Sequence, residues 1–209
     1  MAAAVFAQDG AELQPFLGMK DQFELSLPAG WSVFDQGLVL TGKPAKTGLP
    51  VVFAAEPIDG SAMMSGNREA VVKVADQLAG VETGRIAGFM LDRLPARRGM
   101  SCSGFDRSAQ RALLELVGRD PMFGPGRTVR EAPRAEAMPL GGCQGLRLQG
   151  KGTTSGGDGK NLDVFAVSDG EVVYFFKLLN VDEHREKNLA TLERVLATLR
   201  LTAAPAGGR

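Results

Sequence analysis

The amino-acid sequence predicts one α+β domain in which helices cover both faces of a central, mainly antiparallel sheet. Two apolar runs, residues 162–167 and 171–179, flank an Asp-Gly turn, a pattern typical of a β-hairpin. The second run is apolar on both of its faces, and other stretches carry apolar stripes at helical spacing. A chain of 209 residues is long enough to bury a substantial core as a single domain.

The run at 171–179 decides the layering, because alternate residues of a strand point to opposite faces of its sheet. One set comprises Val172, Tyr174, Phe176 and Leu178, and the other comprises Val173, Phe175 and Leu179. A strand with one face in water would alternate apolar and polar residues. We therefore expect cover on both faces, and helices are the elements available to provide it.

The first quarter of the chain predicts strands. Residues 23–27 alternate apolar and polar side chains, and a Pro-Ala-Gly turn follows them. Further short apolar runs predict strands at 31–34, 37–41 and 51–55, and the segment 43–50 is a Pro/Gly/Lys loop.

The middle of the chain is more helical. A helix is expected from an N-cap at Asn67 to Gly80, and a second over 104–118. Residues 85–94 fit either a helix or a strand, and we favour a helix. Residues 129–138 predict a strand, which Pro133 confines to an edge position.

The last third ends in a helix after the predicted hairpin. Residues 145–150 alternate as a strand, and 150–161 form a Gly/Thr/Ser/Lys connection. Asn180 or Asp182 caps the final helix. Its buried stripe comprises Leu189, Leu192, Val195, Leu196 and Leu199.

The charge balance argues against nucleic-acid binding. The chain has 24 Lys and Arg and 24 Asp and Glu, whereas nucleic-acid binders usually carry a basic excess. Arg93, Arg97 and Arg98 form either a local basic patch or, as we favour, a solvated helix end or loop. No apolar run reaches the roughly 20 residues that a transmembrane helix needs, so we expect no transmembrane segment.

The start of the chain predicts export. Residues 5–7, Val-Phe-Ala, place small side chains where a signal peptidase prefers them, and a polar stretch follows. The alternative is a disordered Ala-rich start. We therefore expect residues 1–17 to be a signal-peptide remnant or a disordered start, residues 18–203 to form the single domain, and the protein to be periplasmic or otherwise exported.

The two cysteines, Cys102 and Cys143, belong to no CxxC motif or cluster. In an oxidising compartment they can pair, which would stabilise the fold by roughly 3–4 kcal/mol in the chain-entropy model. The alternative is two buried free thiols. Conditional on export, we favour the disulfide.

The order of elements resembles a known family. The chain resembles the PsbP-like and DcrB-like group of α/β/α sandwich proteins in three places. These are an opening strand followed by Pro-Ala-Gly-Trp at 28–31, the Pro-Leu-Gly-Gly stretch at 139–142, and Asp-Gly-Glu-Val-Val-Tyr-Phe-Phe at 169–176, which leads into a terminal helix. The resemblance implies this sandwich fold and a role in binding or assembly. It also implies that about 85–135 is a helical insertion. The group shares no catalytic residue set, so no residue role can be carried over.

The motifs tested for chemistry do not meet their requirements. The glycine-rich segment 156–160 lacks the first Gly and the final Ser or Thr of a phosphate-binding loop. The only histidine, His184, suits a surface position in a helix start better than catalysis or zinc binding. Asp158, Asp163 and Asp169 lack the spacing of a calcium loop. We therefore expect no catalytic residues, no cofactor and no metal ion.

The sequence thus favours a non-catalytic binding or assembly module of the cell envelope, whose partner is another protein. Phe89, Met90, Leu91 and Phe123 are candidates for an exposed apolar contact surface, with packing inside the inserted helices as the alternative. Two other functions stay open. One is a cytoplasmic chaperone-like partner of a secreted effector, with free thiols; the other is a hydrolase with an unrecognised site.

Overall fold

The computed structural model describes most of the chain. The described residues are 12–16, 22–43, 45–64, 67–119, 128–153 and 159–202. The predicted contact residue Phe123, the calcium candidate Asp158 and most of the glycine-rich segment 156–160 lie outside them, as do residues 1–11.

A seven-stranded, wholly antiparallel sheet forms the centre of the described fold. In spatial order its strands are β3 (Ser32–Asp35), β4 (Val51–Ala54), β5 (Gly88–Pro95), β11 (Val172–Val181), β10 (Gly159–Ser168), β9 (Cys143–Thr153) and β8 (Thr128–Leu140). A second sheet has the order β1 (Leu13–Phe16), β2 (Phe23–Pro28) and β12 (Arg200–Leu201), and a small hairpin pairs β6 (Met100–Ser101) with β7 (Gly104–Phe105).

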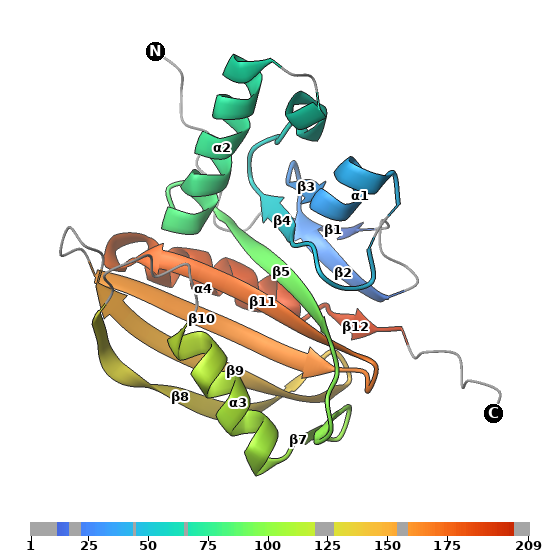
Figure 1. Ribbon diagram of the computed structural model, residues 1–209, viewed down its shortest axis with the longest axis vertical. Coiled ribbons are helices and arrows are strands. Elements are labelled where there is room, and N and C mark those ends of the chain that lie inside the picture. Colours follow the sequence, from blue (N-terminus) through green and yellow to red (C-terminus); the bar gives the residue numbers. More distant parts are fainter. Residues whose placement is uncertain are drawn as a thin grey trace.

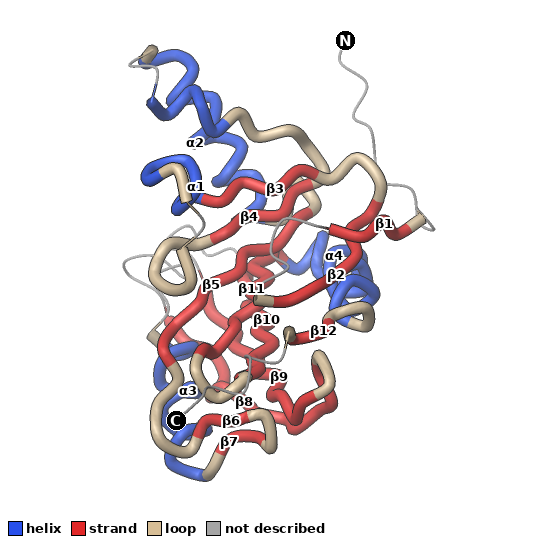
Figure 2. The backbone as a smooth tube through the Cα atoms, turned by 90° about the vertical axis from the view of Figure 1, so that its right-hand side faces the viewer, coloured by secondary structure: helices blue, strands red, loops and turns tan. Residues whose placement is uncertain are grey.

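Helices lie on both faces of the main sheet, as expected. The described helices are α1 (Gln36–Thr41), η1 (Gly60–Met64), a 3₁₀ helix, α2 (Arg68–Thr83), α3 (Arg107–Gly118) and α4 (Asp182–Leu196). Figure 1 shows α3 in front of the sheet and α4 behind it. In the edge-on view of Figure 2, α2 and α3 lie on one side of the sheet, with α4 and the β1-β2-β12 sheet on the other. This arrangement confirms the predicted α/β/α sandwich.

The strand β11 is buried on both faces, which confirms the argument from its composition. Tyr174 and Phe176 belong to the core between the sheet and α4, whereas Val173 and Phe175 belong to the core beneath α3. None of these four side chains is more than 2% exposed.

The prediction of a helix over 85–94 is wrong. Residues 88–95 form β5, which lies between β4 and β11 near the middle of the sheet. The apolar residues of this segment fit the spacing of a helix as well as that of a strand. It forms a strand because it pairs with two neighbouring strands. The predicted insertion at 85–135 is corrected accordingly, because it contains a central strand of the sheet.

Two further expectations are corrected at the start of the chain. Residues 37–41 lie in α1 and not in a strand, since the Asp35 carboxylate accepts a hydrogen bond from the amide of Leu38 and Gly42 ends the helix with a φ of 71°. The stretch 1–17 is not wholly without structure, because β1 pairs with β2.

The edge position expected for Pro133 is confirmed. It belongs to β8, the last strand of the main sheet, and the pairing register of β8 with β9 shifts between Glu131 and Arg134. The missing amide hydrogen of proline is tolerated at such an edge irregularity.

Candidate functional site

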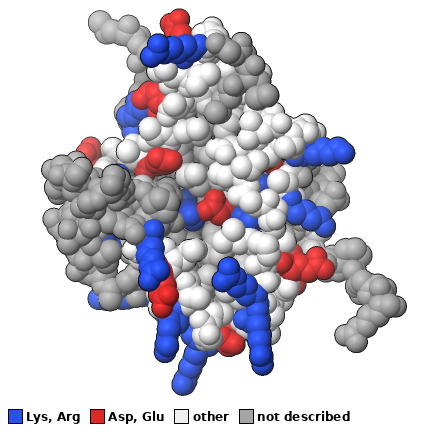
Figure 3. Space-filling view, viewed as in Figure 1, with Lys and Arg blue, Asp and Glu red and all other residues white. Residues whose placement is uncertain are grey.

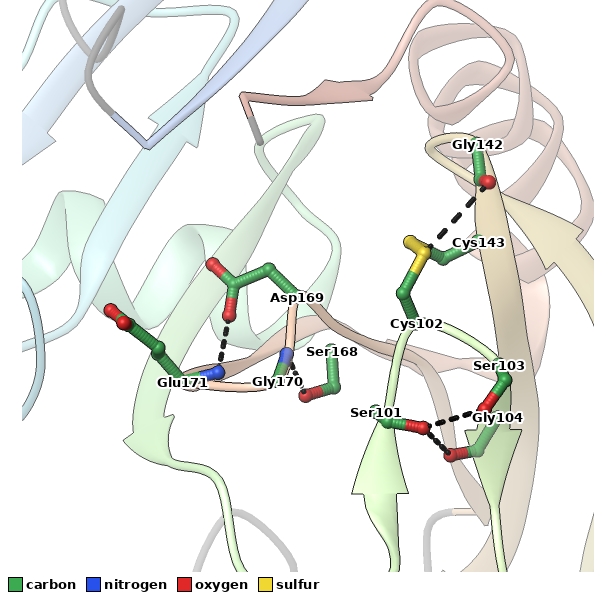
Figure 4. The surroundings of a disulfide bond; sticks show 10 residues. All are labelled: Ser101, Cys102, Ser103, Gly104, Gly142, Cys143, Ser168, Asp169, Gly170 and Glu171. Atoms are coloured by element: carbon green, nitrogen blue, oxygen red, sulfur yellow. Dashed lines mark hydrogen bonds between the residues drawn. A yellow bond between two sulfur atoms is a disulfide. The ribbon is translucent and has the colours of Figure 1, made fainter. Parts of the chain in front are cut away.

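A disulfide joins Cys102 to Cys143, as expected for an exported protein, with 4.7 Å between the two Cα atoms. Cys102 lies in the turn between β6 and β7, and Cys143 opens β9 beside Gly142 (Figure 4). The backbone amide of Gln144 also donates to the carbonyl of Cys102, at 2.9 Å. The segment between β5 and α3 is therefore fastened to the end of the main sheet.

An open apolar groove of about 280 Å³ lies between α3 and β5, next to this fastened segment. Leu113, Val173 and Phe175 line it as buried residues. Leu94 of β5 and Leu116 of α3 also line it and are 38% and 42% exposed. Two leucines that keep so much apolar surface in water across one groove form a candidate contact surface.

Arg97 lines the groove, and the segment that follows it in the chain is rich in arginine. Residues 96–119 contain five arginines and only two acids, Asp106 and Glu115. The arginines are Arg97, Arg98, Arg107, Arg111 and Arg119, and all five are exposed. Within the described part of the chain, none of them forms an ion pair with a carboxylate. Basic side chains gather at the end of the molecule that α3 occupies (Figure 3).

The contact surface predicted from the sequence is not where the groove lies. Phe89 is 1% exposed and stacks on Phe53, with 4.6 Å between ring centroids, and Leu91 is fully buried. Both point from β5 into the core on the α4 side, so their prediction as exposed contact residues is wrong. Met90 points to the opposite face and packs, partly buried, against the small core under α2.

The groove residues were missed for a reason that is visible in the sequence. Leu116 shares the apolar stripe of 104–118, and periodicity alone does not separate its buried centre from its exposed margin. Leu94 was placed in a helix, which hid its position on a strand. The five arginines of residues 97–119 are a sequence signal for a basic surface, and the prediction above included only Arg97 and Arg98 of them.

Arg93, grouped with those arginines from the sequence, is instead fully buried. Its guanidinium donates to the Gln22 side chain and to the carbonyl of Leu49, at 3.1 and 3.2 Å. Burial lowers the pKa of Arg93, and the Asp35 carboxylate opposes that shift. The opposite strand position holds Tyr174, whose hydroxyl donates to Asp169 at 3.0 Å.

A polar pocket of about 170 Å³ surrounds Asp163, an acid that is 1% exposed. The carboxylate accepts hydrogen bonds from Arg185 at 2.9 and 3.0 Å, from Gln149 at 3.0 Å and from Arg147 at 3.3 Å. These donors occupy both oxygens. The Asp163 carboxylate thus lies at the centre of a network of ion pairs with Arg147 and Arg185, an arrangement suited to structure more than to proton transfer or calcium binding.

The remaining candidates for chemistry do not converge. His184 is half-buried in the first turn of α4. Asp169 accepts from the amides of Glu171 and Val172 and so shapes the hairpin turn. Among the described residues, no cluster of three or more His, Cys, Asp or Glu could hold a metal ion, and no helix is both long and apolar enough to cross a membrane.

The described fold is an α/β/α sandwich similar to PsbP-like structures. The chain resembles cyanobacterial PsbP (CyanoP) of Synechocystis in solution, with a TM-score of 0.52, 12% identity and 97% of each chain covered. LpqN of Mycobacterium tuberculosis, described as involved in cell envelope biogenesis, matches with a TM-score of 0.45 and 12% identity over 91% of each chain. A protein of Bacteroides thetaiotaomicron matches with a TM-score of 0.46 and 13% identity, over 90% of this chain and 48% of that one.

In sequence, the chain matches no protein-family model and no curated protein. At 12% identity, the likeness to cyanobacterial PsbP concerns the fold alone, and it agrees with the fold expected from the order of elements in the sequence.

Proposed function

We propose that the protein is a non-catalytic module of the cell envelope that is exported to an oxidising compartment and binds another protein there. The observation that carries the proposal is the Cys102–Cys143 disulfide, because disulfides persist outside the reducing cytosol. The bond fastens one wall of an exposed apolar groove to the main sheet.

The chemistry of the described side chains supports binding over catalysis. The most buried acid, Asp163, is engaged by three donor side chains, and His184 has no partner acid or nucleophile among the hydrogen bonds of the described residues. A hydrolase would need an acid or a nucleophile beside a base in one cleft. The binding or assembly role that the PsbP-like and DcrB-like resemblance implies agrees with this proposal.

The test is affinity capture of the tagged full-length protein after crosslinking in its native cell, with free thiols counted on the same sample. A specific envelope partner together with no free thiols supports the proposal. A cytoplasmic partner with both thiols free would replace it by the chaperone-like function. Absence of any specific crosslink would overturn protein binding as the function.

A further inference from the structure

We propose that the groove between α3 and β5 binds an acidic peptide segment of the partner, with an apolar side chain of that segment inserted between Leu94 and Leu116. This inference rests on the proposed binding function and adds the site and the chemical class of the ligand.

The shape of the groove favours a peptide side chain. Its volume of about 280 Å³ lies just below the range of pockets that enclose whole small molecules. Buried residues Val173 and Phe175 contribute to its lining, and Leu94 and Leu116 remain partly exposed. An inserted leucine or phenylalanine would remove these apolar surfaces from water, as anchor residues do at the centres of protein interfaces.

The charges around the groove specify an acidic partner. Arg97 lines the groove and Arg98 follows it in the chain. Arg119 lies three residues after Leu116, near the same side of α3. Acids are fewer near these arginines: residues 96–120 hold five arginines and three acids, of which Asp106 caps α3 by accepting from the amide of Ala109 at 2.8 Å. Complementary acids on a peptide would be attracted to this rim.

The disulfide holds the groove in a binding-ready form. Met100, which lines the groove, lies two residues before Cys102. Tethering of Cys102 to Cys143 restricts the segment that carries Met100 and Arg97. A restricted wall loses less conformational entropy on binding, so the intact disulfide is expected to strengthen peptide affinity.

The experiment begins with a displayed library of short random peptides selected on the immobilised, oxidised full-length protein. Enriched peptides are expected to carry an excess of Asp and Glu around one apolar residue. The most enriched sequence is then synthesised with a fluorescent label, and its affinity is measured by fluorescence anisotropy. Affinity should fall as salt is raised, since exposed charge pairs are screened.

Variants locate the site. Arg97→Glu with Arg119→Glu, and separately Leu116→Glu, are each expected to weaken peptide binding about tenfold or more. The matched controls are Arg68→Glu and Val72→Glu on α2, whose side chains are also exposed but lie away from the groove. These controls should bind as the unmodified protein does, and thermal unfolding confirms that every variant is folded.

Three outcomes would overturn the groove proposal. They are the absence of selected peptides, enrichment without acidic residues, and equal weakening by the α2 controls. Binding to vesicles of phosphatidylcholine and phosphatidylglycerol that the groove variants abolish, without peptide selection, would assign the surface to lipid. If crosslinking identifies an envelope partner but its contacts map elsewhere, the proposed function stands and the groove proposal fails.

Discussion

The guanidinium of Arg93 lies 3.9 Å from the carboxylate of Asp35, and both side chains are almost entirely buried, at 0% and 7% exposure. Arg93 comes from β5 and Asp35 from the end of β3, two strands that β4 separates. A buried cation is stabilised only when an anion and hydrogen-bond acceptors compensate its lost hydration. This pair therefore links the edge of the main sheet to its centre.

Substitution of Arg93 by Met should destabilise the protein by about 3–5 kcal/mol, because it leaves the buried Asp35 carboxylate without its cation. In a protein that already carries Asp35→Asn, the same change should cost markedly less. Urea denaturation of the two single variants and the double variant measures this coupling. Additive effects would show that the two side chains do not stabilise each other.

Tyr174 should make the protein less stable in alkali. Burial and the nearby Asp169 carboxylate raise the pKa of its hydroxyl. The unfolded chain thus loses this proton first, and the free energy of unfolding should decline as pH rises above the ordinary tyrosine value of about 10. Below that pH the stabilisation that comes from the raised pKa of Tyr174 is fully present.

Tyr174 is the only tyrosine in the chain, so its ionisation can be followed directly by ultraviolet absorbance. Folded protein should resist ionisation until a higher pH than urea-unfolded protein. Tyr174→Phe should flatten the alkaline decline in stability. Ionisation at the same pH in both states would contradict the inferred shift.

Removal of the disulfide by Cys102→Ser with Cys143→Ser should lower the free energy of unfolding by about 3–4 kcal/mol, since the bond closes a separation of 41 residues. Reduction of the unmodified protein should have a similar effect, whereas reductant should leave the double variant unchanged. Equal stability of oxidised and reduced protein would show that the bond does not restrain the unfolded chain.

Asp163→Asn should cost about 1–3 kcal/mol, because Arg147 and Arg185 would lose a buried charged acceptor. Glu193→Gln provides a matched control, since Glu193 also pairs with Arg147 at 3.0 Å but is 45% exposed. An exposed ion pair contributes about 0–1 kcal/mol, so the control should change stability little. If denaturant unfolding showed that both variants lose the same free energy of unfolding, the buried Asp163 would not differ from the exposed Glu193 in its contribution to stability.

The sequence by itself determined the elements whose local signals agreed. Asn67 accepts from the amides of Glu69 and Ala70 at the start of α2, as its N-cap position predicted. The hairpin of β10 and β11 followed from its Asp-Gly turn and apolar runs. The double-sided burial of β11 also followed, because a strand without polar positions has no face to present to water.

The tertiary structure decided what local patterns left ambiguous. The apolar side chains of residues 88–95 fit the spacing of a helix and that of a strand, and only their pairing with β4 and β11 makes them a strand. That pairing buries Phe89 and Leu91, leaves Leu94 at the groove and places Arg93 inside the core. The position of the groove depends on which strands are neighbours and which helix crosses them, and this information lies in contacts between segments distant in the sequence.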